Sequence, residues 1–342
     1  MNEEDARKLA EHHAPIFAQK VSAEWKAADM IAPIDFAGSF ENVNKNPDKF
    51  LKLRHGDTDT LKPIIYYSVC ETKTHFYIIY AVYHILDWWK RLKPINLYDL
   101  IRESLDEHIH DMEGALFVIR NEQEEPLDAI ITIAHDNFYL YTNPPPPKEG
   151  LIKPGREQKY RRIVKFNETI DGHIWPDKQS KRIKLYIQSK GHGIYGDHKH
   201  WGGGEEIWYY HHKSVESDPR PKDTINPKKK GDIQPDIGLK KEYELESIFQ
   251  QDGLWDYRSN THVFLQNKKG KWGFVYYDEK KKRYFGGSAN PPWSWNDRND
   301  LNPMGEIATD PARLIIQYAQ GWGPVSTHYN YNPYLGITES EA

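Results

Sequence analysis

The run of residues 64–85 constrains the fold of this chain more than any other segment. It reads IIYYSVCETKTHFYIIYAVYHI and consists mostly of aromatic and β-branched residues, with two polar breaks. Such residues favour strands, so we predict two strands, PIIYYSVCE and HFYIIYAVYHI. The only cysteine of the sequence, Cys70, lies in this run. This position predicts an inert, buried thiol, and a single cysteine excludes an intramolecular disulfide.

Strand-like segments are spread over the whole chain of 342 residues, with no regular alternation of strands and helices. Helices are predicted near the two ends. One ends near His13, before Pro15, and the other begins at Pro311 with Asp310 as its N-cap. This organisation predicts a mainly β (α+β) protein with an antiparallel β-sandwich core, flanking helices and long loops.

One segment interrupts the pattern of strands. Residues 216–240 are rich in Pro, Lys and Asp and contain few apolar side chains, which predicts a mobile Pro/Lys-rich loop. We expect residues 1–215 to form a β-sandwich domain that carries a metal site. Residues 241–342 are then expected to form a β/α extension that packs on the same core.

The charge balance and the hydropathy narrow the range of partners. With 46 Lys and Arg against 50 Asp and Glu, the net charge of −4 gives no basic field for nucleic acid. No apolar stretch has the roughly 18 residues that a membrane span needs, so we expect a soluble protein without a transmembrane segment. The acidic start MNEEDARKLAEHH does not resemble a signal peptide. A cytoplasmic protein and a mature secreted form both remain open, as does the oligomeric state.

The segment EHIHDMEG, residues 107–114, brings titratable groups to the start of an apolar run. If a strand begins near Asp111, then Asp111 and Glu113 point to the same face, because side chains alternate along a strand. His108 or His110 can turn onto that face from the preceding loop. Carboxylates with imidazoles suit Mg²⁺, Ca²⁺ or Mn²⁺, and Zn²⁺ where imidazoles dominate. The alternative interpretation is a set of solvated charges before a strand.

Two other strand ends carry similar chemistry. YAVYHILDWW ends an aromatic strand with His84 and Asp87, and IKLYIQSKGHGIYG ends at His192 between two glycines. The glycines predict close backbone approach and an imidazole exposed at a rim. Three such strand ends suggest one shared site. In IAHDNFY, His135 and Asp136 are expected inside a strand or at its edge. Two interpretations remain open: a histidine oriented by a carboxylate as a general base, or a structural histidine.

The segments LAEHHAPIF, YAVYHILDWW, HIHDMEGALFVI and IKLYIQSKGHGIY, in this order, resemble the Vps62-like proteins. HIHDMEG also resembles GHRHDWE, the heptapeptide of the necrosis-inducing NPP1 family. Four residues match that heptapeptide: His108, His110, Asp111 and Glu113. Met112 replaces its tryptophan, Ile109 replaces its arginine, and its first glycine is missing.

The NPP1 resemblance, which covers about residues 8–200 through short motifs, implies a β-sandwich that holds a divalent ion. An Asp at the end of an aromatic strand and the His, Asp and Glu of the heptapeptide would be its ligands. On this chain these are Asp87, His108, Asp111 and Glu113. The disulfides frequent in that family cannot form here, and the C-terminal third has no counterpart in it.

Three functions are compatible with these features. The first is a metal-dependent hydrolase or lyase acting on a glycan or phosphoester, with His192 or His135 in proton transfer. The second, from the NPP1 resemblance, is a non-catalytic, cytolysin-like module that binds a glycan or a lipid headgroup. The third is an intracellular Vps62-like protein with a structural metal. The sequence contains no HExxH, GxSxG or P-loop motif that would favour a known catalytic mechanism.

Overall fold

The structure is a computed structural model. It describes residues 1–22, 26–51, 61–87, 109–142, 159–161, 167–173, 176–177, 180–197, 206–213, 238–278, 282–285, 289–298, 302–318 and 324–338. The helices are α1 (Glu3–His13), α2 (Asn46–Leu51), α4 (Glu306–Thr309) and α5 (Pro311–Tyr318), with short 3₁₀ helices η1 (Lys26–Asp29), η2 (Phe40–Lys45), η3 (Asp256–Ser259), η4 (Pro292–Ser294) and η5 (Pro333–Leu335). None of the helices among these residues is both long enough and apolar enough to cross a membrane.

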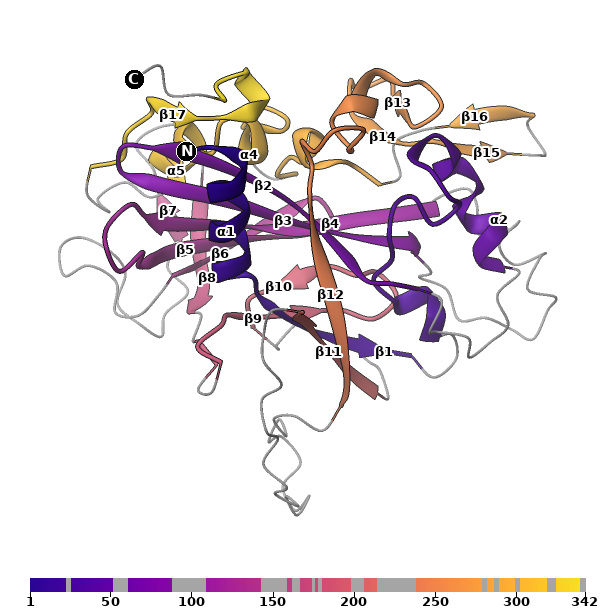
Figure 1. The fold of residues 1–342 in the computed structure, drawn as a ribbon, viewed down its shortest axis with the longest axis horizontal. Helices are drawn as coiled ribbons and strands as arrows, with labels where there is room; N and C mark the ends of the chain where they lie inside the picture. Colours follow the sequence, from indigo (N-terminus) through magenta and orange to yellow (C-terminus); the bar gives the residue numbers. More distant parts are fainter. Residues whose placement is uncertain are drawn as a thin grey trace, which may run out of the picture.

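Strands dominate the described chain (Figure 1). They are β1 (Ile16–Val21), β2 (Ile64–Thr72), β3 (His75–Leu86), β4 (Ile109–Arg120), β5 (Leu127–Ala134), β6 (Asn137–Thr142), β7 (Lys159–Arg161), β8 (Asn167–His173), β9 (Lys184–Ile187), β10 (Ile194–Tyr195), β11 (Glu206–His212), β12 (Leu239–Ser247), β13 (Phe264–Gln266), β14 (Trp272–Phe274), β15 (Tyr276–Asp278), β16 (Arg283–Phe285) and β17 (Tyr329–Tyr331). The predicted mainly β class is therefore confirmed.

The predicted antiparallel sandwich is not what these strands form. Thirteen of them make one mixed sheet in the order β10-β9-β1-β11-β12-β2-β3-β4-β5-β6-β8-β7, with β17 on β2. Four of its pairings are parallel: β1 with β9, β11 with β12, β12 with β2, and β6 with β8. The sheet curls strongly, so that β10, the last strand at one edge of the sheet, lies against β4 and β5 near its middle.

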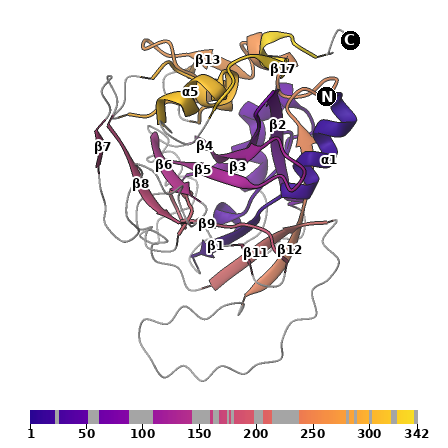
Figure 2. The same cartoon turned by 90° about the vertical axis from the view of Figure 1, so that its left-hand side faces the viewer.

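Strand β12 explains why there is one sheet rather than two. Its first half, residues 239–243, pairs with β11, and its second half, residues 244–247, pairs with β2. In Figures 1 and 2, β12 runs along one side of the molecule between the layer of β2 to β5 and the layer of β1, β9 and β11. Backbone hydrogen bonds therefore join two layers that would otherwise be the separate sheets of a sandwich.

The aromatic run forms two strands, as predicted, and these strands, β2 and β3, lie in the middle of the sheet. β2 pairs with β3 and β3 with β4, all antiparallel. Almost every residue of β3 is buried, so both faces of the strand are covered, and its sequence shows no polar alternation for that reason. Two of the buried tyrosine hydroxyls pair with the backbone: Tyr80 donates to the carbonyl of Ala10 at 2.7 Å, and Tyr66 accepts from the N–H of Ile34 at 2.8 Å. Cys70 is buried, and burial raises the pKa of its thiol.

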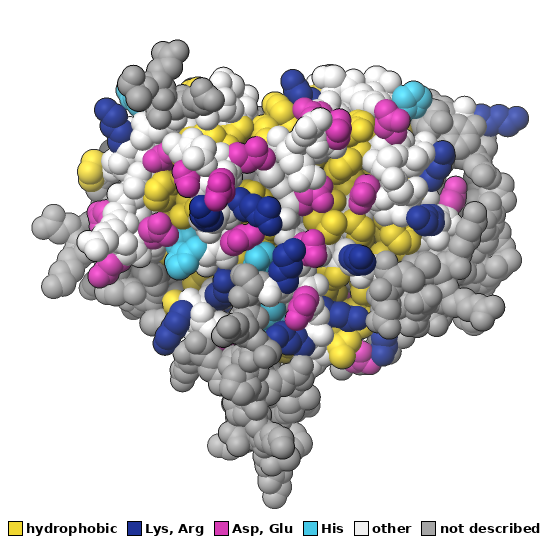
Figure 3. Space-filling model, in the orientation of Figure 1, with side chains coloured by type: hydrophobic (Ala, Val, Ile, Leu, Met, Phe, Trp, Pro, Cys, Tyr) yellow, Lys and Arg dark blue, Asp and Glu magenta, His cyan; other side chains and the backbone are white. Residues whose placement is uncertain are grey.

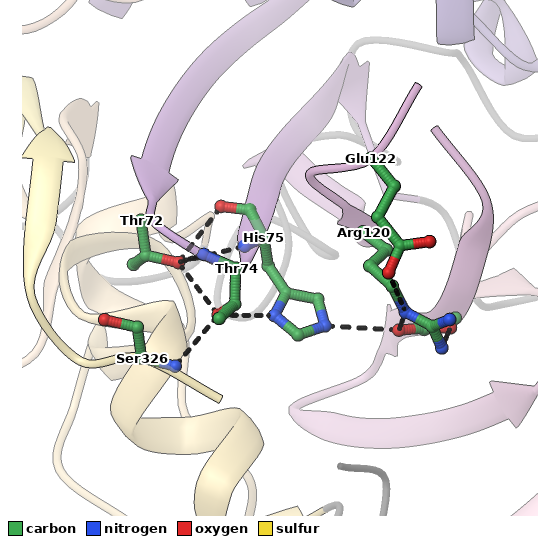
Figure 4. A network of polar contacts seen from close by, with 7 residues as sticks. Thr72, Thr74, His75, Arg120, Glu122 and Ser326 are labelled. Atoms are coloured by element: carbon green, nitrogen blue, oxygen red, sulfur yellow. Dashed lines mark hydrogen bonds and ion pairs between the residues drawn. The ribbon is translucent and has the colours of Figure 1, made fainter. Parts of the chain in front are cut away.

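The C-terminal third covers the outer face of the sheet. Trp295 is buried, and its Nε1 donates to the carbonyls of Met112 and Asn290 at 3.1 and 2.8 Å. It lies against Gly114 so closely that a Cβ there would be 2.4 Å from the indole. At the turn between β2 and β3, the N–H of Ser326 donates to Oγ1 of Thr74 at 2.9 Å (Figure 4).

The predicted helix ends are confirmed, since α1 ends at His13 and α5 begins at Pro311. His135 and Asp136, predicted inside a strand or at its edge, form the turn of the hairpin between β5 and β6. Both turn residues have positive φ, 54° and 61°, as a tight hairpin turn requires. Most of the loop predicted at residues 216–240 lies outside the described residues, and the domain division there stays a prediction.

Candidate metal centre inside the curled sheet

The register of β3 and β4 brings the first site residues together. His84 lies directly opposite Asp111, and Val82 lies opposite Glu113. Directly paired residues of an antiparallel sheet share a face, so His84, Asp111 and Glu113 point to the interior of the curl. His84 is completely buried, while Asp111 and Glu113 are 8% and 6% exposed.

His110, the other histidine of the segment, points elsewhere. Its φ of 62° interrupts the regular alternation of β4. Nδ1 of the ring lies 2.6 Å from the hydroxyl of Tyr83, and Nε2 lies 3.2 Å from the carbonyl of Val275. His110 is therefore a structural residue between the sheet and the C-terminal third. His108, the predicted ligand, lies outside the described residues.

His192 reaches the same interior from the connection between β9 and β10. Its Nδ1 lies 3.2 Å from Oδ2 of Asp111, and its Nε2 lies 3.2 Å from Oδ1 of Asp29. The imidazole has no exposed surface, so the prediction of an exposed histidine at a rim is wrong. The flanking glycines explain the burial: a Cβ on Gly191 would lie 2.7 Å from the ring of His135.

His84 and His192 stack face to face, with ring centroids 3.8 Å apart and an interplanar angle of 6°. His84, His192 and Asp111 each offer one ligand atom, and these atoms lie within 4.8 Å of one another, close enough for one metal ion. The amide nitrogen of Gln19, on β1, lies 3.1 Å from Nε2 of His84. Nδ1 of His84 and Oε1 of Gln19 are buried without a hydrogen-bond partner among the described residues.

Further carboxylates surround this group. Asp87 follows β3 directly, and burial together with the charges of Asp111 and Asp29 raises its pKa to about 8, partly offset by His192. Burial and then the charge of Asp111 raise the pKa of Glu113 well above its usual range. The charge of Asp111 thus acts on two further buried carboxyl groups in this cluster, those of Asp87 and Glu113.

The two histidines differ in charge. Burial alone would lower the pKa of His192, but its hydrogen bonds to Asp111 and Asp29 and their charges raise it to about 10. Burial, and next the charge of His192, lower the pKa of His84 well below its usual range. His192 is therefore an imidazolium clamped by two carboxylates, and His84 is neutral. A clamped imidazolium is poorly suited to accept a proton at neutral pH.

Asp29 is a member of the site that the sequence analysis missed. It ends η1 and is fully buried. Its Oδ2 accepts from the N–H of Ser22, and its Oδ1 accepts from the N–H of Lys190, both at 2.8 Å. No local pattern marks it, because η1 has neither strand alternation nor a helical repeat.

His135 lies at the edge of the cluster rather than within it. Its backbone N–H donates to Oε1 of Glu113 at 2.9 Å, and its Nε2 lies 3.1 Å from Oε1 of Gln188. The carboxylate of Asp136 pairs with Lys271 and with Arg298. The predicted alternative of a histidine oriented by Asp136 is therefore not formed, and Gln188 orients His135 instead.

The sequence matches no protein-family model and no curated protein. Several solved structures are similar in part. Necrosis and Ethylene inducing Protein 2 from the causal agent of cocoa's Witches Broom disease shares 15% identity, with a TM-score of 0.28 over 58% of this chain and 69% of that chain. NLPPya in complex with glucosamine shares 13% identity, with a TM-score of 0.27 over 57% and 67% of the two chains. NLPPya in complex with mannosamine shares 16%, with a TM-score of 0.21 over 39% and 43%. The chain thus has a distant and partial structural similarity to necrosis-inducing proteins, and similarity at this level is a matter of fold alone.

Proposed function

We propose that this protein binds a divalent metal ion inside the curled sheet. Asp111 is the central ligand, Asp87 and Glu113 are the further carboxylate ligands, and His84 supplies a nitrogen. The observation that supports the proposal is the buried group of His84, Asp111 and His192, whose ligand atoms lie within 4.8 Å of one another. Nδ1 of His84 has no hydrogen-bond partner among the described residues. His108, a ligand implied by the NPP1 resemblance, remains part of the proposed set.

The charges favour a cation. Asp29, Asp87 and Asp111 act on a single imidazolium, His192, and Asp111 also acts on the carboxyl group of Glu113. Burying like charges without compensation costs several kcal/mol, and a divalent ion would offset that cost. Oxygen ligands with one imidazole suit Mn²⁺, Mg²⁺ or Ca²⁺. Zn²⁺ would fit better if His192 released its Nδ1 proton and joined His84 as a second nitrogen ligand.

Gln19 would orient His84. Metal-binding histidines usually donate their second ring N–H to an oxygen, which fixes the free lone pair on the first nitrogen. A half-turn of the Gln19 amide would let its partnerless Oε1 accept from Nε2 of His84. Nδ1 of His84 would then present a lone pair to the ion.

The first test is metal content, measured by mass spectrometry on protein purified without chelator. We expect one ion per chain in the wild type and none in Asp111→Asn combined with Glu113→Gln. Asp297→Asn is the matched control, because Asp297 is equally buried but lies outside the cluster, and it should keep the ion. A wild type without metal, or a double variant that keeps it, would refute the proposal.

We further propose that the ion organises a binding site for a polar ligand such as a glycan or lipid headgroup. The clamped state of His192 supports binding over catalysis. Glucosamine is a suitable probe, because its ammonium group complements the carboxylates, and N-acetylglucosamine is the neutral control. Calorimetry should show metal-dependent binding of glucosamine that the double variant loses. Equal binding with and without metal would contradict this role.

A hydrolase or lyase is the second candidate, and the position of His135 favours it. The backbone N–H of this half-buried residue donates to Glu113, and its imidazole, which contacts Gln188, could take a proton at the edge of the site. If so, glycoside or phosphoester turnover in Mn²⁺ should fall in His135→Gln with the ion retained. Metal that only raises the melting temperature, with neither turnover nor ligand binding, would favour the third role, a structural ion.

A further inference from the structure

A second group of metal-binding side chains lies on the outer surface, far from the interior cluster. His12 and His13 end α1, and Glu125 belongs to the turn between β4 and β5. That turn follows the end of β4 opposite to Asp111. The nine residues from Asp111 to Arg120 span about 30 Å of extended strand, so the two sites are independent.

The three side chains already face one another. Nε2 of His13 lies 2.9 Å from Oε2 of Glu125. The rings of His12 and His13 meet edge to face, with centroids 4.7 Å apart. One ligand atom from each of the three residues lies within 4.8 Å of the others. Two imidazoles and a carboxylate form the three-residue donor set found in zinc sites that keep a fourth position open.

The backbone holds Glu125 in place at a cost. Its φ is 44°, and it precedes Pro126, which disfavours helical conformations in the preceding residue. A non-glycine residue in the left-handed region is strained and persists only where its surroundings fix it. Here the N–H of Glu125 donates to the carbonyl of Glu122 at 2.9 Å, while its carboxylate contacts His13.

The surrounding charges are mixed. The C-terminal end of a helix attracts a cation. Glu124, next to Glu125 in the turn, lines a surface groove beside the site and adds a second acidic residue there. Arg182 opposes a cation, because its guanidinium occupies the last carbonyls of α1, those of Glu11 and Ala14, at 2.9 and 2.8 Å. Because Arg182 already donates to these two carbonyls, the imidazoles of His12 and His13 are the groups at this helix end that can bind a metal ion.

A surface groove of about 580 Å³ adjoins the site. It is lined by residues along one face of α1 and by the turn, including Asp5, Lys8, His12, Glu124 and Glu125. Figure 3 shows the face that carries α1, where acidic and basic side chains are interspersed with hydrophobic ones and histidines reach the surface. A ligand in the groove could therefore reach an ion held by the three residues.

We propose that His12, His13 and Glu125 bind a zinc-class transition-metal ion whose fourth position opens to this groove. The ion links the end of α1 to the β4–β5 turn and can accept water or an anionic group as its outer ligand. Imidazole ligands favour Zn²⁺, and Cu²⁺ still more, over Mg²⁺ and Ca²⁺. This site does not depend on the metal centre inside the sheet.

The test needs a readout that distinguishes the two sites. Histidine modification by diethylpyrocarbonate, followed by peptide mass spectrometry, reports on His12 and His13 directly. We expect Zn²⁺, but not Mg²⁺, to protect both residues in the full-length protein. His12→Gln and Glu125→Gln should each weaken zinc binding at this site on the order of tenfold or more. His328→Gln, which removes an exposed histidine elsewhere, is the control and should change nothing.

Both variants alter solvent-accessible side chains, and unchanged circular dichroism should show that they fold. Zinc that leaves the modification rates of His12 and His13 unaltered would overturn the proposal. So would variants that bind zinc at this site as tightly as the wild type. Loss of protection in Glu125→Gln with the interior metal content unchanged is the result that supports the site.

Discussion

At the scale of single residues, His192 shows how neighbours decide the state of a side chain. Glycines on both sides suggested an exposed imidazole, but their lack of a Cβ instead lets the segment pack against Ala134 and His135. Once buried, the imidazole is stable only because Asp111 and Asp29 hold its two nitrogens. The same residue type between glycines can thus mark a surface or a core, depending on what packs against the glycines.

This packing leads to a prediction for Gly193→Ala. The new Cβ would lie 2.9 Å from the Cβ of Ala134 and 3.1 Å from Nε2 of His135. We expect the free energy of unfolding to fall by about 1–3 kcal/mol, because overpacking a dense interior forces the chain to shift. Urea unfolding measures the change, and metal content should drop with it. An unchanged unfolding midpoint together with full metal content would show that His192 does not depend on this contact.

At the scale of elements, the hairpin of β5 and β6 shows a limit of pattern reading. The segment LDAIITIAHDNFYLYT keeps strand-forming residues on both sides of its turn, so it reads as one strand. The turn contains no glycine and no proline, the usual signals, but His135 and Asp136 adopt positive φ. His, Asp and Asn tolerate positive φ better than most other residues, so the segment AHDN was the only sequence signal of this turn.

Strand β12 carries an unusual set of acids for the strand that joins the two layers. From residue 242 on, every second residue of the strand is a glutamate, so one face of the strand carries Glu242, Glu244 and Glu246. Glu246 pairs with Tyr66 of β2. Burial, followed by the charges of Asp35 and Glu244, raises the pKa of Glu246 to about 7. The folded protein therefore binds a proton at Glu246 more tightly than the unfolded chain does.

A pH dependence follows from this group. Because its pKa is raised in the folded state, its stabilising contribution is present below the unfolded pKa of about 4.5 and is lost as pH rises through about 7. We expect Glu246→Gln to raise the melting temperature at about pH 8 and to leave it nearly unchanged at about pH 4. Glu242→Gln, an exposed acid on the same face, is the control. A gain of equal size at both pH values would refute this assignment.

At the scale of the whole molecule, the C-terminal third and the curled sheet share one core. The indole of Trp295 lies against Gly114 of β4 and donates to the carbonyl of Met112. The N–H of Ser326 donates to Oγ1 of Thr74 at the β2–β3 turn, and the same oxygen lies 2.9 Å from Nδ1 of His75 (Figure 4). The hydrogen bonds from Trp295 and Ser326 link residues that are 183 and 252 positions apart in the sequence.

Trp295→Ala tests whether these parts unfold together. Truncating a buried tryptophan costs about 3–5 kcal/mol, and we expect that loss in one cooperative transition. Leu335→Ala, which truncates a side chain that is 54% exposed, should change stability by less than about 0.5 kcal/mol. Fluorescence and circular dichroism should report coincident curves for the tryptophan variant. Two separate transitions would mean that the C-terminal third folds as an independent unit.

The sequence by itself determined the β class, the aromatic strands, the end of α1, the start of α5 and the placement of Asp111 and Glu113 on one face. These properties depend on residue propensity and on the alternation of side chains, which act over a few residues. Tertiary structure alone decided that β12 joins two layers into one curled sheet, that His192 is buried, and that His84 and Asp29 lie beside Asp111. Each of these depends on pairing or packing between segments far apart in the chain, where local pattern carries no information about register or partner.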